Sequence, residues 1–175
     1  MKHEDRSALG IAYRAASRSV DPSTQNGAYL LNEIDGSLQG VMGTNSPVKG
    51  MEIDWEHAHK SEFMHHAEES AILSAATRGL STRGATLYVP WYCCLRCARS
   101  IVGAKITRVV GHKELAAFSM QVNLKWRETT LAGLQVLTNA GIKCEWITGP
   151  VIAGPIMHAG KSWNPTLLEG TVNES

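Results

Sequence analysis

Two short motifs constrain this chain more than any other feature: H-A-E at residues 66–68 and C-L-R-C at residues 94–97. One imidazole and two thiolates are preferred ligands of zinc, and three such ligands leave the fourth tetrahedral position open for water. Glu68 follows the histidine by two residues, where its carboxylate could move a proton of that water. We therefore predict that His66, Cys94 and Cys97 bind Zn²⁺ and that Glu68 is the catalytic acid and base.

Both motifs stand at the beginning of a predicted helix. Residues 67–77 are rich in helix formers and carry alanine and isoleucine on one face. Cys94 and Cys97 are three residues apart, so they face the same way on one helical turn. The partial positive charge of a helix N-terminus favours thiolate over thiol. Cys93 is one turn before Cys97, so the spacing also permits Cys93 and Cys97 as the ligand pair.

The composition is that of one ordinary globular domain: 175 residues, of which 43% are hydrophobic and 19% charged. The net charge is +1 and no basic cluster is visible, so we expect no nucleic-acid partner. No apolar run approaches about 18 residues and no signal pattern precedes the domain, so we expect a cytoplasmic protein without a membrane partner. Three of the four cysteines lie within residues 93–97, which favours metal binding in a reducing compartment over disulfides.

The order of predicted elements is α-β-β-α-β-α-β-α-β. It predicts an α/β fold, a three-layer α/β/α sandwich around a five-stranded mixed sheet. The first two strands, near residues 28–31 and 38–42, should form an antiparallel hairpin, and strands joined by crossover helices should be parallel. The helical stretch at residues 115–140 should break before Lys125. We expect residues 1–175 to form a single domain, with residues 151–175 as a Gly/Pro-rich extension whose role the sequence leaves open.

An H-A-E on one helix, followed by a strand and a C-x-x-C that opens the next helix, resembles the zinc-dependent cytidine and deoxycytidylate deaminases. The resemblance covers residues 7–146 and is to the dCMP deaminases of phages and bacteria. Those enzymes usually have proline before the first ligand cysteine, where this chain has Cys93. The resemblance implies the cytidine-deaminase fold, a nucleotide substrate, and a homo-oligomer with dCTP and dTTP as effectors.

Two loops extend the resemblance to the substrate site. D-P-S-T-Q-N-G at residues 21–27 is similar to a stretch before the first strand of deoxycytidylate deaminases, and G-T-N-S-P-V-K-G at residues 43–50 is similar to their G-Y-N-G-x-P-x-G loop. The second similarity implies that Asn45 bonds the sugar. Hydroxyls and cations bind phosphate strongly, so Ser23 and Lys49 are predicted to hold the substrate phosphate. Trp91 is either a wall of the base pocket or a core tryptophan, and both loops could also be plain surface turns.

These features lead to one preferred reaction, the zinc-dependent hydrolysis of dCMP to dUMP and ammonia. Glu68 would take a proton from water, deliver it to N3 of the cytosine ring and then protonate the leaving amino group. Glu69 is turned by about 100° on the helix, so we expect it to be a solvated charge. Three alternatives stay open: a 5-substituted cytosine nucleotide or a nucleoside as substrate, a nucleic-acid substrate, and a non-catalytic zinc module. A structural zinc site would normally have a fourth protein ligand.

Overall fold

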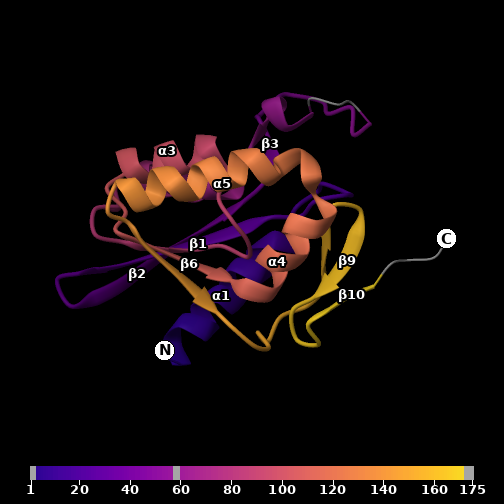
Figure 1. Cartoon of the computed structure of the whole chain (residues 1–175). Helices are drawn as coiled ribbons and strands as arrows, with labels where there is room; N and C mark the ends of the chain where they lie inside the picture. The colour runs from indigo at the N-terminus through magenta and orange to yellow at the C-terminus, as the bar shows by residue number, and fades with distance from the viewer. Residues whose placement is uncertain (1–2, 57–59, 172–175) are drawn as a thin grey trace.

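In the computed structural model, which describes residues 3–56 and 60–171, a five-stranded sheet lies between two layers of helices (Figure 1). The helices are α1 (His3–Ala16), α2 (Ala67–Thr77), α3 (Leu95–Gly103), α4 (Lys113–Val122) and α5 (Leu124–Asn139), with a 3-10 turn η1 (Lys60–Phe63). The central strands are β1 (Gly27–Ile34), β2 (Ser37–Thr44), β5 (Thr86–Tyr88), β6 (Arg108–His112) and β7 (Lys143–Ile147). Two short strands, β3 (Ser46–Pro47) and β4 (Met64–His65), pair with each other ahead of α2.

The strand order is β2-β1-β5-β6-β7, and β1 is antiparallel to both of its neighbours. β5, β6 and β7 are parallel, as expected for strands joined by the crossover helices α3 and α4–α5. The β1–β2 hairpin turns at Asp35 and Gly36, which have φ of 51° and 74°, the left-handed pair of a tight hairpin turn. The predicted five-stranded mixed sheet and its antiparallel first pair are confirmed.

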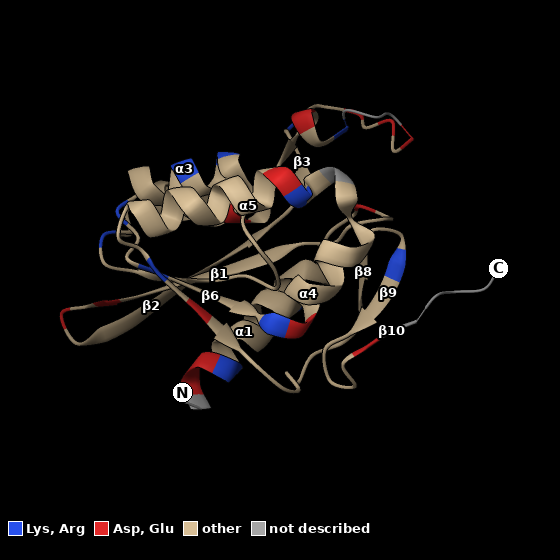
Figure 2. Cartoon of the chain, in the orientation of Figure 1, with Lys and Arg blue, Asp and Glu red and all other residues tan. Residues whose placement is uncertain are grey.

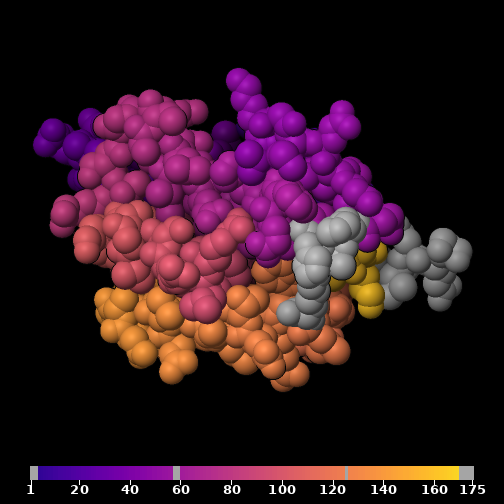
Figure 3. All heavy atoms as spheres, turned by 90° about the horizontal axis from the view of Figure 1, so that it is seen from above, coloured from indigo at the N-terminus to yellow at the C-terminus, as the bar shows by residue number. Residues whose placement is uncertain are grey.

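Two hydrophobic cores lie on the two faces of the sheet, because successive strand residues point to opposite sides. Leu87 packs under α2, α3 and α5, whereas Tyr88 packs with α1, α4 and the C-terminal segment. In the view from above, α3 and α5 lie side by side in rose and orange (Figure 3). The three-layer α/β/α arrangement predicted from the element order is therefore confirmed.

The start of α2 is pressed directly onto the hairpin at Gly43. A Cβ atom added to Gly43 would lie 2.1 Å from the carbonyl oxygen of Ala67 and 2.4 Å from the backbone nitrogen of Ala71. Only glycine therefore permits this close approach of β2 and the helix. The contact fixes the height above the sheet at which the residue before Glu68 lies.

The C-terminal segment is more ordered than its composition suggested. A second sheet forms there from β8 (Ile156–His158), β9 (Lys161–Asn164) and β10 (Glu169–Thr171), and residues 172–175 of the predicted extension lie outside the described residues. The predicted break in the helical stretch occurs at Asn123, between α4 and α5. Within the described ranges, no helix combines the length and apolar character needed to cross a membrane.

Candidate active site

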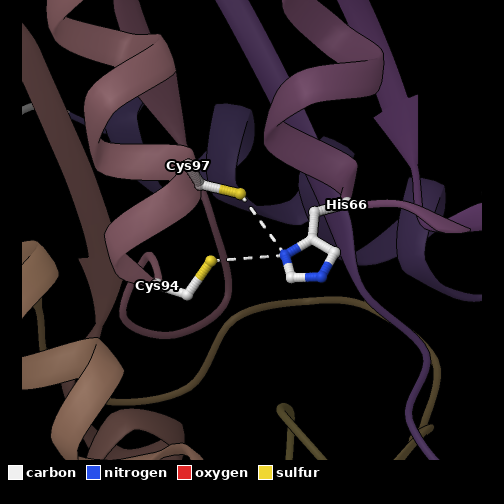
Figure 4. A group of neighbouring side chains, drawn as sticks. All are labelled: His66, Cys94 and Cys97. Carbon is white, nitrogen blue, oxygen red and sulfur yellow. Dashed lines mark hydrogen bonds between the residues drawn. The ribbon is translucent and has the colours of Figure 1, made fainter. Parts of the chain in front are cut away.

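Three sequence-predicted ligands converge where the N-termini of α2 and α3 meet (Figure 4). His66 is the N-cap residue of α2, with extended backbone angles of φ −75° and ψ 157°. Cys94 is the N-cap residue of α3, and Cys97 follows in the first turn of that helix. The side chains point toward one another from the two helices, so the positive ends of both helix dipoles face the same small volume.

The spacing of these side chains fits a tetrahedral zinc ion. His66 Nδ1 is 3.4 Å from the Sγ atoms of both Cys94 and Cys97, and the three ligand atoms all lie within 4.8 Å of one another. Zn–S and Zn–N bonds of about 2.3 and 2.0 Å at tetrahedral angles give an S···N separation of about 3.5 Å. Among the described residues these three form the group able to hold a metal ion, and buried Cys93 does not belong to it. The donor set supports zinc as the cofactor.

The two cysteines are primed for metal binding. A hydrogen bond from Cys97 lowers the pKa of Cys94 to about 4, against the opposing effect of burial. The pKa of Cys97 is raised because its thiol is the donor in that pair and because it is buried. Because zinc binds thiolates, at least the proton held by Cys97 must leave when the metal binds, so metal affinity should fall as pH falls.

Glu68 is buried beside this group, with only 2% of its surface exposed. Burial raises the pKa of Glu68, and the negative charge of Cys94 raises it further. The amide Nδ2 of Asn26 lies 3.5 Å from Glu68 Oε2, the outer limit of a hydrogen bond. A carboxylate with a raised pKa in a pocket is suited to both accepting and returning a proton near neutral pH.

A pocket of about 710 Å³, which includes some open solvent, lies in front of these residues. Its walls include three aromatic side chains, Trp91, Tyr92 and Trp126. The Trp126 and His66 ring centroids are 5.5 Å apart, edge to face. Trp126 belongs to none of the motifs singled out in the sequence. Its place in the pocket depends on how α5 crosses α3, which no local pattern near residue 126 reveals.

Two of the four predicted substrate residues, Asn45 and Trp91, line the pocket. The Asn45 amide is already engaged: its Oδ1 accepts from the backbone nitrogen of Asn26 at 2.7 Å, and its Nδ2 donates to the carbonyl oxygen of Thr24 at 2.9 Å. Asn45 therefore ties the loop after β2 to the loop before β1. Its predicted contact with the sugar stays a prediction.

The other two predicted substrate residues, Ser23 and Lys49, do not line the pocket. Lys49 is exposed in the turn after β3 and does not line the pocket, whereas Lys60 does. Lys60 Nζ donates to Asp21 Oδ1 at 2.9 Å and to Ser23 Oγ at 2.8 Å. No spacing rule marks Lys60 from sequence, because the contact joins residues 39 positions apart. The predicted phosphate roles of Ser23 and Lys49 stay predictions.

The expectation for Glu69 is wrong. Its side chain is only 18% exposed, and its Oε2 is 2.8 Å from Arg96 Nη2. Arg96 also donates to the carbonyl oxygen of Met64 at 2.9 Å. The pair therefore bridges the two helices that carry the ligands. The orientation of Glu69 on α2 could not reveal this, because its partner comes from α3.

Comparison with known proteins shows the family to which these motifs belong. The family model of the cytidine and deoxycytidylate deaminase zinc-binding region matches residues 2–113. The chain belongs to this deaminase family. The match covers both motifs, and it ends where α4 begins, so the pocket side chains of α4 and α5 lie beyond it.

Individual relatives of this deaminase-family chain are distant. The deoxycytidylate deaminase of Mus musculus is 29% identical over 111 residues, 58% of this chain and 60% of that protein. ComE operon protein 2 of Bacillus subtilis (strain 168) is 32% identical over 108 residues, 58% of this chain and 54% of that protein. The chain thus spans about 60% or less of the length of these curated relatives.

Among solved structures, dCMP deaminase from the cyanophage S-TIM5 in complex with dCMP and dUMP has a TM-score of 0.60 and 20% identity, covering 84% of this chain and 99% of that one. Guanine deaminase from Nitrosomonas europaea has a TM-score of 0.54 and 14% identity, covering 81% and 75%. At these identities the similarity establishes the fold, which is that of deaminases acting on different bases.

Proposed function

We propose that this chain is a zinc-dependent hydrolytic deaminase of a cytosine nucleotide and that it converts dCMP to dUMP and ammonia. The observation that carries the proposal is the buried Glu68 carboxylate, which faces the same pocket as His66 and Cys94. The deoxycytidylate deaminases among the relatives support the choice of a cytosine nucleotide.

The chain's own residues supply the proton path. Bound zinc, held by His66, Cys94 and Cys97, would activate water by lowering its pKa toward neutrality. Glu68 would take a proton from that water and deliver it to N3 of the cytosine ring, which makes C4 more electrophilic. After the hydroxide has added to C4, Glu68 would take the proton of the new C4 hydroxyl and pass it to the exocyclic nitrogen, so that the C4–N bond breaks and ammonia leaves. Burial raises the pKa of Glu68, which makes its carboxylate a stronger base than a solvated one and keeps more of it in the protonated form that a general acid needs near neutral pH.

A free nucleotide suits the electrostatics better than a nucleic acid. Lys and Arg are interspersed with Asp and Glu along the described chain (Figure 2), and the full sequence carries a net charge of only +1. The cation in the pocket lining is Lys60, and it is paired with Asp21. We propose that the substrate phosphate takes over part of the hydrogen bonding of Lys60, with the Ser23 hydroxyl beside it.

The decisive assay is loss of cytosine absorbance and release of ammonia by zinc-loaded protein, with dCMP, deoxycytidine and a single-stranded oligonucleotide as substrates. Glu68→Gln should keep zinc and fold but lose about 10²–10⁴-fold in kcat. Near-normal turnover in Glu68→Gln would refute the mechanism. Release of ammonia would exclude the non-catalytic zinc module.

Lysine variants locate the phosphate site. If Lys60 binds the phosphate, Lys60→Met should lower kcat/KM for dCMP by about 10–100-fold, while deoxycytidine is unaffected. Lys49→Met is the matched control on the exposed turn, and a larger loss there would restore Lys49 as the phosphate ligand. Equal kcat/KM for dCMP and deoxycytidine in the wild type would indicate a nucleoside deaminase.

We also propose a homo-oligomer that responds to dCTP and dTTP, as the family resemblance implies. Light scattering of the eluting protein would test the assembly. Rates with and without each nucleotide would test the regulation.

A further inference from the structure

The C-terminal sheet, β8–β10, forms hydrogen bonds along the loop that precedes β1. In Figure 1 the yellow strands lie beside the indigo segment that leads from α1 into β1. The backbone nitrogen of Gln25 donates to the carbonyl oxygen of Met157 at 2.8 Å, and that of Gly160 donates to the carbonyl oxygen of Ser23 at 2.8 Å. The backbone nitrogen of Ala159 donates to Thr24 Oγ1 at 3.3 Å. The loop at residues 21–26 is thus held from outside by a segment more than 130 residues away.

Gln25 makes a bracket between these two parts of the chain. Its Oε1 accepts from the backbone nitrogen of Met157 at 2.9 Å, and its Nε2 donates to the carbonyl oxygen of Ser19 at 3.1 Å. One amide therefore joins β8 to Ser19, which follows the end of α1. These two hydrogen bonds require a donor and an acceptor on the same side chain. Glutamine supplies both, whereas ionised glutamate and methionine do not.

The loop held by this bracket forms one wall of the pocket. Asp21, Thr24 and Asn26 line the pocket, although Gln25 itself does not. The Asn26 amide reaches toward Glu68 from the end of the loop. Gln25 therefore lies behind the wall and acts on the pocket only through its neighbours.

The same sheet touches a second wall. His158 of β8 is fully buried, and its ring centroid is 4.4 Å from that of Trp91, which lines the pocket. The C-terminal sheet thus contacts the pocket's loop wall and its aromatic wall. Both contacts come from residues beyond the part of the chain that matches the family, which ends at residue 113.

We propose that the sheet β8–β10 is part of the substrate-binding apparatus and that Gln25 is the positioning residue through which it fixes the loop at residues 21–26. The inference rests on the proposed function. α2 and α3 carry the candidate zinc ligands and Glu68, and Asn26, the loop residue that reaches Glu68, is held separately by Asn45. Loosening residues 21–25 should therefore weaken substrate binding and leave the chemical step intact.

The test compares Gln25→Met with Gln135→Met, the same substitution at an exposed position of α5. Gln25→Met should raise KM for dCMP by about tenfold or more, with kcat within about twofold and zinc content unchanged, because two hydrogen bonds that order the loop are lost. Gln135→Met should match the wild type. An unchanged KM in Gln25→Met, or a fall in kcat and zinc with KM constant, would overturn the proposal.

Hydrogen exchange gives a second measurement that does not depend on turnover. In the wild type, binding of dUMP should slow exchange at the Met157 and Gly160 amides, which donate to the loop. Unchanged exchange at both amides while dUMP is bound overturns the coupling. A wild type that neither binds dUMP nor releases ammonia refutes the proposed function instead. In that case, equal exchange of the 19–26 amides in the two Gln variants overturns the bracket itself.

Discussion

Replacement of Gly133 by alanine should damage both stability and metal binding. Gly133 lies on the face of α5 that packs against the loop carrying Cys94, the first candidate zinc-ligand cysteine. A Cβ atom there would be 2.3 Å from the carbonyl oxygen of Cys93 and 2.9 Å from the carbonyl carbon of Cys94, where 3.4 Å is the start of ordinary contact. Because both neighbours are backbone atoms, α5 or the cysteine loop must move by about 1 Å.

The expected magnitude is the difference between two effects. Forcing an extra carbon into a packed interface costs about 1–3 kcal/mol, and this contact is with rigid backbone, so the upper part of that range applies. Alanine recovers about 1 kcal/mol through its higher helix propensity. The free energy of unfolding should therefore fall by about 1–2 kcal/mol. Zinc ligand distances tolerate shifts of only about 0.2 Å, so displacement of Cys94 should weaken zinc binding by about tenfold or more.

The matched control is Gly103→Ala, at the end of α3, where an added Cβ meets nothing within 4 Å. It should leave stability unchanged or raise it by up to about 1 kcal/mol. Denaturant unfolding in the presence of a chelator measures the fold without the contribution of bound metal. Competition with a chromophoric chelator then measures zinc affinity. If Gly133→Ala matched Gly103→Ala in both measurements, the close packing of α5 on the cysteine loop would be refuted.

Three further predictions address the polar groups around the site. A double-mutant cycle of Glu69→Gln and Arg96→Met should give a coupling of about 0.5–1 kcal/mol by denaturant unfolding, as for a partly exposed ion pair, and zero coupling would contradict the bridge. Burial lowers the pKa of His158 to about 4, below its ordinary 6.5. The folded state thus favours neutral His158, and this contribution to the free energy of unfolding is fully present above pH 6.5. As the pH falls from 6.5 toward 4, the free energy of unfolding should decrease by roughly 3 kcal/mol. His158→Leu should flatten that part of the pH–stability curve, and a variant with the wild-type slope would exclude His158 as the cause. Metal analysis should find zinc retained in Cys93→Ser and lost in Cys94→Ser, and the reverse result would make Cys93 the ligand.

The candidate cysteine ligands and Glu68 could be identified from sequence because each lies in a short motif at the start of a helix. Residues at helix starts, with two- and three-residue spacings, have few ways to point. The sheet was predictable for a related reason: the crossover rule and the short hairpin allow few arrangements of five strands. Residues 151–171 could not be predicted in the same way. The glycines and prolines of this segment gave no sign of its three short strands. Outside its own sheet, β8 forms hydrogen bonds with the loop near Gln25.

Motif spacing was enough to indicate the metal, its three candidate ligands and the candidate acid–base residue, and the crossover rule was enough to predict a five-stranded mixed sheet. Tertiary structure alone decided the pocket around them. Lys60 rather than Lys49 lines it, Glu69 pairs with Arg96 across two helices, and Trp126 reaches His66 from α5. Glu69 and Arg96 are 27 positions apart in sequence, Lys60 and its partner Asp21 are 39 apart, and His66 and Trp126 are 60 apart. Such pairings depend on how packed elements cross, and hydrophobic periodicity carries no information about that crossing.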